Sequence, residues 1–303
     1  MTLTTAMRGV TVAYVLAVLL VAAGVWLTYN TFLVGQSSGK GGLRIAVTFP
    51  SLLEDVKALA CEDDAVEAIA PAGVDPHEYQ LTPQDLALLR ESDLIVSTGH
   101  APFEMRIAEL VQKGEIKARL IEIPSIPGIK LLKNPATGQP NYHMPILDPS
   151  NYLVFIRNLT DTMIQLRPAC AASYRERSAE IERRVNSLVA EAPRLNVTAL
   201  AQSPVAQYYL EWLGVRVKYL LIREHDLPST PEDVAAAEKA LASGEVQLVV
   251  SVKGTEGTPL GSKAQELASR YQVPILYVPS PSEPGGVLLK IEEVVEDIKS
   301  MKK

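Results

Sequence analysis

The feature that most constrains this chain is a regular alternation of strand-like and helix-like segments that begins at Leu43. Short runs rich in β-branched residues are separated by amphipathic stretches of helical period. Helices placed between strands in this way make crossover connections, which join parallel strands. The pattern therefore predicts an α/β protein with two parallel sheets. The predicted strands cover residues 43–49, 65–70, 93–99, 118–123, 196–201, 215–222, 246–252 and 274–278.

The expected halves are separated by a long helical stretch. Apolar residues recur every three or four positions from about residue 150 to residue 192, which predicts one long linking helix with Pro168 as the point where it could break. We expect a first lobe over 43–148, a linking helix over 149–194 and a second lobe over 195–303. Ligands of open parallel sheets bind beyond the carboxyl ends of the strands, so two facing lobes would form a binding cleft.

An apolar segment precedes the α/β part. No charged residue lies between Arg8 and Lys40, and Val10–Leu27 is long enough to cross a hydrocarbon core of about 30 Å. Trp26, Tyr29 and Phe32 follow it, as aromatic residues do at membrane interfaces. We interpret residues 1–34 as an N-terminal transmembrane helix that contacts membrane lipid. A cleaved signal peptide is the alternative.

The rest of the N-terminal region predicts where the α/β part lies. Residues 35–42, GQSSGKGG, have the composition of a flexible linker. No cysteine follows the apolar segment closely, so a lipidated cysteine is not expected there. With Arg8 on the cytoplasmic side, the α/β part would stand on the extracytoplasmic face of the cell membrane.

Charge and motif content exclude several functions. The chain has 29 Lys and Arg against 35 Asp and Glu, a net charge of −6 without a basic run, so no nucleic-acid partner is expected. Neither a GxSxG elbow nor a GxGxxG turn after the first strand occurs. Cys61 and Cys170 form no CxxC pair. They could form a disulfide outside the cytoplasm, but we expect two separate buried thiols.

Histidines are the residues that most suggest a ligand. The chain has four: His77, His100, His143 and His225. His77 and His100 follow the second and third predicted strands, so they should lie at the same edge of the first sheet. Neutral imidazole is a common ligand for Zn²⁺ and similar ions. No HxH or HExxH pair is present, so spacing alone does not mark a metal site.

Two segments resemble a known family. Pro71–Glu104 closely resembles the metal-specific cluster of ABC-transporter solute-binding proteins, which serve zinc, manganese or iron uptake. Asn141–Asn151, NYHMPILDPSN, is similar to that family's second histidine segment. The resemblance covers nearly all of residues 43–303 and is more specific in the first half. The matching positions of the first segment are Gly73, Asp75, Pro76, His77, Tyr79, Asp85, Asp93, Gly99 and Glu104.

The resemblance implies a receptor that captures zinc or manganese in the interlobe cleft and delivers it to an ABC permease in the membrane. His77 and His143 match the family's first two ligands. The positions of the third and fourth ligands hold Ser203 and Ser280, so both second-lobe ligands are missing. Hydroxyls are poorer Zn²⁺ ligands than imidazole or carboxylate. The nearby substitutes are Glu283, His225 and Asp226.

Two other functions stay open on the same scaffold. Because the second-lobe ligands are missing, the cleft could hold a non-metal solute or a metal chelate. An enzyme would need a fixed metal with an open coordination position and a nearby base. Glu78 beside His77 is the one obvious candidate base. We rank this last and expect no enzyme.

Overall fold

The computed structural model describes residues 41–224 and 227–301. The part that begins at Gly42 is one compact unit and is described by itself. The predicted membrane anchor, residues 1–34, and nearly all of the predicted linker lie outside the described residues, as do His225 and Asp226. Among the residues that are described, no helix is both long enough and apolar enough to cross a bilayer.

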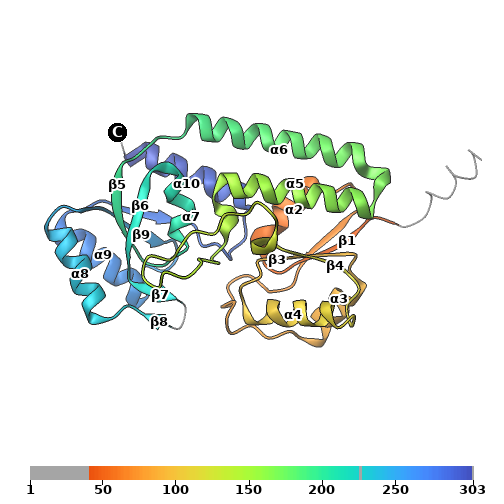
Figure 1. The fold of residues 1–303 in the computed structure, drawn as a ribbon, viewed down its shortest axis with the longest axis horizontal. Coiled ribbons are helices and arrows are strands. Elements are labelled where there is room, and N and C mark those ends of the chain that lie inside the picture. The colour runs from red at the N-terminus through yellow and green to blue at the C-terminus, as the bar shows by residue number, and fades with distance from the viewer. Residues whose placement is uncertain (1–40, 225–226, 302–303) are drawn as a thin grey trace, which may run out of the picture. The chain divides into compact units, whose positions relative to one another are not determined.

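The first lobe is a four-stranded parallel sheet in the order β2-β1-β3-β4 (Figure 1). The crossover helices follow from local sequence. Helix α3, for example, begins with a capping box in which Thr82 and Asp85 satisfy each other's backbone amides. The elements are β1 (Arg44–Val47), α2 (Leu53–Leu59), β2 (Ala65–Ala68), α3 (Pro83–Glu91), β3 (Leu94–Ser97), α4 (Pro102–Gln112) and β4 (Arg119–Glu122).

The second lobe is another four-stranded parallel sheet, in the order β10-β9-β5-β6. Both predicted sheets are therefore confirmed. The sequence analysis did not anticipate a short antiparallel pair, β7 and β8, directly after β6. The elements are β5 (Val197–Ala201), α7 (Ala206–Leu210), β6 (Val215–Leu220), β7 (Ile222–Glu224), β8 (Leu227–Pro228), α8 (Pro231–Ala242), β9 (Val246–Val252), α9 (Pro259–Tyr271), β10 (Ile275–Val278) and α10 (Val287–Met301).

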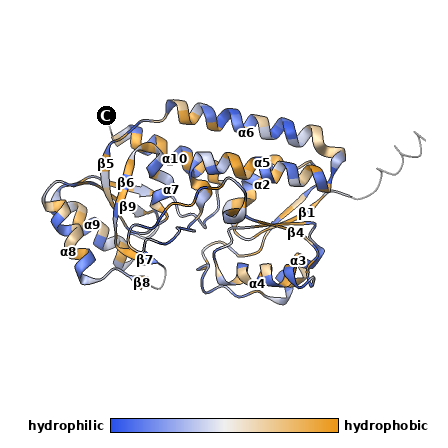
Figure 2. Cartoon of the chain, in the orientation of Figure 1, coloured by the Kyte–Doolittle hydropathy of each residue, from blue (hydrophilic) through white to orange (hydrophobic). Residues whose placement is uncertain are grey.

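The segment between the lobes is a helical hairpin, so the prediction of one long linking helix is wrong. Helix α5 (Pro149–Leu166) ends at Arg167, and α6 (Ala171–Glu191) packs back along it, with Arg157 of α5 paired to Glu182 of α6. Pro168 explains the turn, because a residue that precedes proline avoids the helical conformation; Arg167 has φ −140° and ψ 79°. Figure 2 shows hydrophilic residues along much of α6, whereas β1 is hydrophobic.

Short 3₁₀ turns complete the connections. The one between α5 and α6, η4, brings Cys170 to the end of α2, where it forms a disulfide with Cys61. The expectation of two separate thiols is therefore wrong, because the hairpin joins positions that are 109 residues apart. The 3₁₀ turns are η1 (Pro50–Leu52), η2 (Ile123–Ser125), η3 (Pro145–Leu147), η4 (Pro168–Cys170) and η5 (Glu211–Leu213).

One hydrophobic core serves both lobes. It includes Ile45 of the first sheet, Phe155 of the hairpin and Val250 of the second sheet, all buried. Separate clusters fill the space beneath α3 and α4 in the first lobe and beneath α8 and α9 in the second. This core is continuous and joins the two lobes. Loops at the carboxyl ends of the strands in both lobes line a shared cavity.

Candidate metal centre

A cavity of about 620 Å³ lies at the carboxyl ends of the strands of both lobes. This is where open parallel sheets bind ligands. Four segments of the first lobe form the first wall: they follow β1, β2 and β3 and directly precede η3. The loops after β9 and β10 form the second wall. The cavity-lining residues are Phe49, Gly73, Val74, Asp75, Pro76, His77, Thr98, His100, Ala101, Tyr142, His143, Met144, Thr255, Thr258, Pro281, Ser282 and Glu283.

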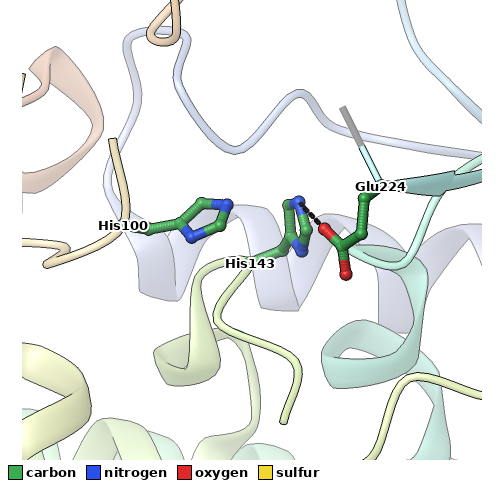
Figure 3. Close-up of side chains that lie close together, drawn as sticks. All are labelled: His100, His143 and Glu224. Carbon is green, nitrogen blue, oxygen red and sulfur yellow. Dashed lines mark ion pairs between the residues drawn. The ribbon is translucent and has the colours of Figure 1, made fainter. Parts of the chain in front are cut away.

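Three potential ligands lie close together here, and two of them, His100 and His143, line the cavity. His100, His143 and Glu224 each offer one ligand atom, and these three atoms lie within 4.8 Å of one another. Figure 3 shows the His143 ring between the His100 ring and the Glu224 carboxylate. His100 follows β3, His143 precedes η3 and Glu224 ends β7. Segments from both lobes therefore bring two imidazoles and one carboxylate together.

The orientation of His143 is fixed by Asn141. The Asn141 amide nitrogen donates to the Pro204 carbonyl oxygen and to Gln207 Oε1, both at 2.9 Å, so its oxygen is the acceptor. That oxygen lies 2.9 Å from His143 Nδ1 and accepts its proton. Nδ1 is then the protonated nitrogen, and Nε2 is the nitrogen with the lone pair that metal binding requires. The arrangement is that of a metal-binding imidazole held by a supporting hydrogen bond.

Glu224 is held in a similar way from a distant part of the chain. The buried Asn134 amide donates to the Arg223 carbonyl oxygen at 2.7 Å and to Glu224 Oε1 at 2.8 Å. The other oxygen, Oε2, lies 3.5 Å from His143 Nε2. Ligand atoms at about 2.1 Å from a tetrahedral ion are separated by roughly 3.4 Å. His143 and Glu224 are therefore already spaced as two ligands of one ion.

The segment that carries Asn134 and Asn141 is itself attached to the second lobe. The Tyr208 hydroxyl of α7 donates to the Asn141 carbonyl oxygen at 2.5 Å and accepts the Leu132 amide at 3.0 Å. Burial raises the pKa of Tyr208 to about 12, so the hydroxyl stays neutral and can donate. Gln207 also donates to the Lys133 carbonyl oxygen. The connecting segment before His143 is thus hydrogen-bonded to α7 of the second lobe.

His77 and His100 stand on adjoining turns, as their positions after β2 and β3 predict. The His77 backbone amide donates to Asp75 Oδ1 at 2.9 Å. The centroids of the His77 and His100 rings are 5.3 Å apart, and those of His100 and His143 are 4.5 Å apart. The His100 ring is therefore close to the rings of both other histidines.

The other residues suggested by the sequence have different positions. Glu283 lines the cavity with an exposed side chain, whereas Ser203 and Ser280 are not among the lining residues. Glu78, the candidate base beside His77, is exposed and does not line the cavity either. The sequence analysis missed Glu224. The sequence did contain a signal for Glu224: it is a carboxylate just past the predicted strand at 215–222, and it precedes His225, which was named as a possible ligand.

The comparisons with known proteins decide the family. The family model described as the periplasmic component A of the zinc-uptake complex matches residues 45–288. The chain belongs to this zinc-uptake component A family. The match includes the helical hairpin and nearly all of both lobes, so it covers His77, His100, His143 and Glu224.

Similar proteins are named as metal-binding components. The iron-binding protein YfeA of Yersinia pestis is 23% identical over 254 residues, 80% of this chain and 79% of that protein. The metal ABC transporter substrate-binding lipoprotein FimA of Streptococcus parasanguinis is 22% identical over 77% of this chain and 79% of its own length. The solved structure of FpvC from Pseudomonas aeruginosa with Mn²⁺ has a TM-score of 0.68 at 21% identity, covering 86% of this chain and 99% of that one, which shows a shared fold.

Proposed function

We propose that this chain is the extracytoplasmic solute-binding protein of an ABC importer. It captures a divalent metal ion, such as zinc or manganese, between its two lobes and delivers it to the membrane permease. The observation that carries the proposal is the pairing of His143 Nε2 with Glu224 Oε2 at 3.5 Å in the interlobe cleft. Membership of the zinc-uptake component A family supports it.

The ligands that we assign to the ion are His77, His143 and Glu224. Two neutral imidazoles and one carboxylate are donors that Zn²⁺ accepts readily and that other divalent ions share. Glu224 supplies the second-lobe ligand that is missing at the family's ligand positions, Ser203 and Ser280. Asn134 and Asn141 hold Glu224 Oε1 and His143 Nδ1, and the other two atoms, Glu224 Oε2 and His143 Nε2, lie 3.5 Å apart.

The proposed location is the outer face of the cell membrane. Val10–Leu27 supports a single apolar anchor, and residues 35–42 have the composition of a flexible tether. Relatives such as FimA are named as lipoproteins, whereas an apolar helix would retain this chain by a different means. Either anchor, a lipid or an apolar helix, would keep a receptor close to its permease.

Isothermal titration of the purified full chain in detergent with Zn²⁺ and with Mn²⁺ tests the function. We expect one ion per chain, and a loss of affinity of about 100-fold or more for His143→Ala and Glu224→Ala, beyond the cost of losing a supporting partner. Ser203→Ala and Ser280→Ala are matched controls outside the cavity lining, expected to bind as the wild type does. If neither Zn²⁺ nor Mn²⁺ binds, the proposal is rejected.

A metal chelate is a second candidate cargo. The cavity of about 620 Å³ is much larger than one ion and falls within the range of about 300–1,000 Å³ typical of small-molecule sites. Thr255, Thr258 and Ser282 place hydroxyl groups on its second-lobe wall. Native mass spectrometry of the chain isolated without added metal distinguishes the two. A mass increment larger than one ion supports the chelate, and an increment of one bare ion contradicts it.

A further inference from the structure

His100 occupies a turn that is built to hold it. Gly99 has a φ of 67°, in the left-handed region that glycine adopts without steric cost. The buried Glu104 carboxylate accepts the backbone amides of His100 and Ala101 at 2.9 Å each, and that of Thr98 at 2.7 Å. The turn is thereby fixed against β3, and the imidazole is directed into the cavity.

The position of the His100 ring decides what an ion in the cleft would meet. The centroid of this ring lies 5.3 Å from that of His77 and 4.5 Å from that of His143. Tyr142 stacks on the same ring at 6.2 Å with an interplanar angle of 20°. An ion bound by both His77 and His143 would therefore lie close to the His100 imidazole. Its donor nitrogen already belongs to the cluster with His143 and Glu224.

We propose that His100 is a third imidazole ligand of the transported ion, which makes the site one of three nitrogens and one carboxylate that selects Zn²⁺ and similar borderline ions over Mn²⁺. This inference rests on the proposed function, since it assumes that His143 and Glu224 bind the same ion. His100 then takes the place of the ligand that the second lobe lacks. Three of the four donors come from residues that precede the helical hairpin.

The expected selectivity follows from the chemistry of the donors. Imidazole suits zinc, copper, nickel and iron, whereas manganese prefers carboxylate, carbonyl and water oxygens. For a given set of nitrogen and oxygen ligands, Mn²⁺ binds most weakly of the first-row divalent ions and Zn²⁺ much more tightly. Each imidazole that replaces an oxygen ligand widens this difference. A His100 that only packs against its neighbours would leave the preference between Zn²⁺ and Mn²⁺ unchanged.

The test is chelator competition on the full chain in detergent, with Zn²⁺ and Mn²⁺ as probes. His100→Ala is expected to lower Zn²⁺ affinity by about 100-fold or more, since losing a residue that only orients a ligand costs roughly 10- to 100-fold. Mn²⁺ affinity should fall by much less. His100→Glu, which exchanges the imidazole for a carboxylate, should move the preference toward Mn²⁺. X-ray absorption of the zinc-loaded protein should show three imidazoles in the wild type and two in His100→Ala.

The outcomes separate this inference from the proposed function. If the wild type binds neither ion, or His143→Ala has no effect, the metal assignment itself fails. If His143→Ala weakens binding but His100→Ala leaves both affinities within about twofold, His100 is not a ligand and this inference alone is overturned. Thermal unfolding of each variant shows whether it is folded. Should His100→Ala unfold, the His100→Glu selectivity and the imidazole count in the wild type decide the matter.

Discussion

The two walls of the cleft are held in different ways. In the first wall each histidine is fixed by a neighbour in sequence: His77 by Asp75, His100 by Glu104 and His143 by Asn141. On the side of the second lobe the supports come from far away in the sequence. Glu224 is held by Asn134, 90 residues earlier, and the start of α10 is capped by Asp55, 232 residues earlier. Local supports leave motifs in a sequence, and long-range supports do not.

Asp55 is the clearest example of a long-range support. Its buried carboxylate, on α2 of the first lobe, accepts the Tyr152 hydroxyl and the Val287 amide, both at 2.6 Å. Burial raises its pKa. Lys290, one turn into α10, donates to the Glu283 carbonyl oxygen of the loop that lines the cavity. The first lobe thereby positions a cavity loop of the second lobe.

The largest expected effect comes from breaking this support. Asp55→Ala should lower the free energy of unfolding by about 3–5 kcal/mol, the cost of removing one member of a buried charged network. Exposed Asp161→Ala is the control and should stay within about 0.5 kcal/mol of the wild type. Urea denaturation followed by circular dichroism measures both. An equal effect of the two variants would mean that Asp55 gives no more support than a surface residue.

The disulfide tests a long-range link that lies away from the cleft. Replacing Cys61 and Cys170 by serine together should lower the free energy of unfolding by about 2–4 kcal/mol, because the cross-link restricts the unfolded chain. Metal affinity should remain within about twofold of the wild type, since neither cysteine lines the cavity. Denaturation and titration are run on the same preparation. A large loss of affinity would show that the hairpin corner also positions the ligands.

A substitution at Asn134 tests whether Glu224, the proposed ligand from the second lobe, depends on its hydrogen-bond partner. Asn134→Ala removes the hydrogen bond to Glu224 Oε1 and should lower Zn²⁺ affinity roughly 10- to 100-fold, as loss of a partner that orients a ligand does. Exposed Asn186→Ala on α6 is the matched control and should bind as the wild type does. Chelator competition measures the affinities. Wild-type affinity in Asn134→Ala would argue that Glu224 needs no support.

The smallest expected effect is a pH dependence of stability from Lys290. Burial lowers the pKa of Lys290 to about 8. Between pH 8 and 10 the unfolded chain therefore binds this proton more strongly than the folded protein does, so this group's contribution to stability rises with pH, by about 1–2 kcal/mol. Lys290→Met should remove that rise. Unfolding free energies of the wild type and the variant at several pH values test it, and identical profiles would contradict it.

Local sequence determined much of this protein. Strand composition, helix caps such as Thr82 and the spacing of apolar residues predicted both parallel sheets, because these signals act over a few residues. The same signals placed His77 and His100 after the second and third strands, whereas His143 was suggested by the resemblance of its segment to the family's second histidine segment. Pro168 marked where the helical stretch could break, but not that the two helices pack back on each other.

Tertiary structure decided what sequence spacing could not. The hairpin brought Cys61 to Cys170, and the connecting segment carried Asn134 to Glu224, because hydrogen bonds and packing across the cleft join residues with no periodic relation. The fold also placed the His100 ring close to those of His77 and His143. From the sequence alone, a histidine after a strand is an ordinary loop residue. Only the fold shows that His100 lies close to His143 and Glu224.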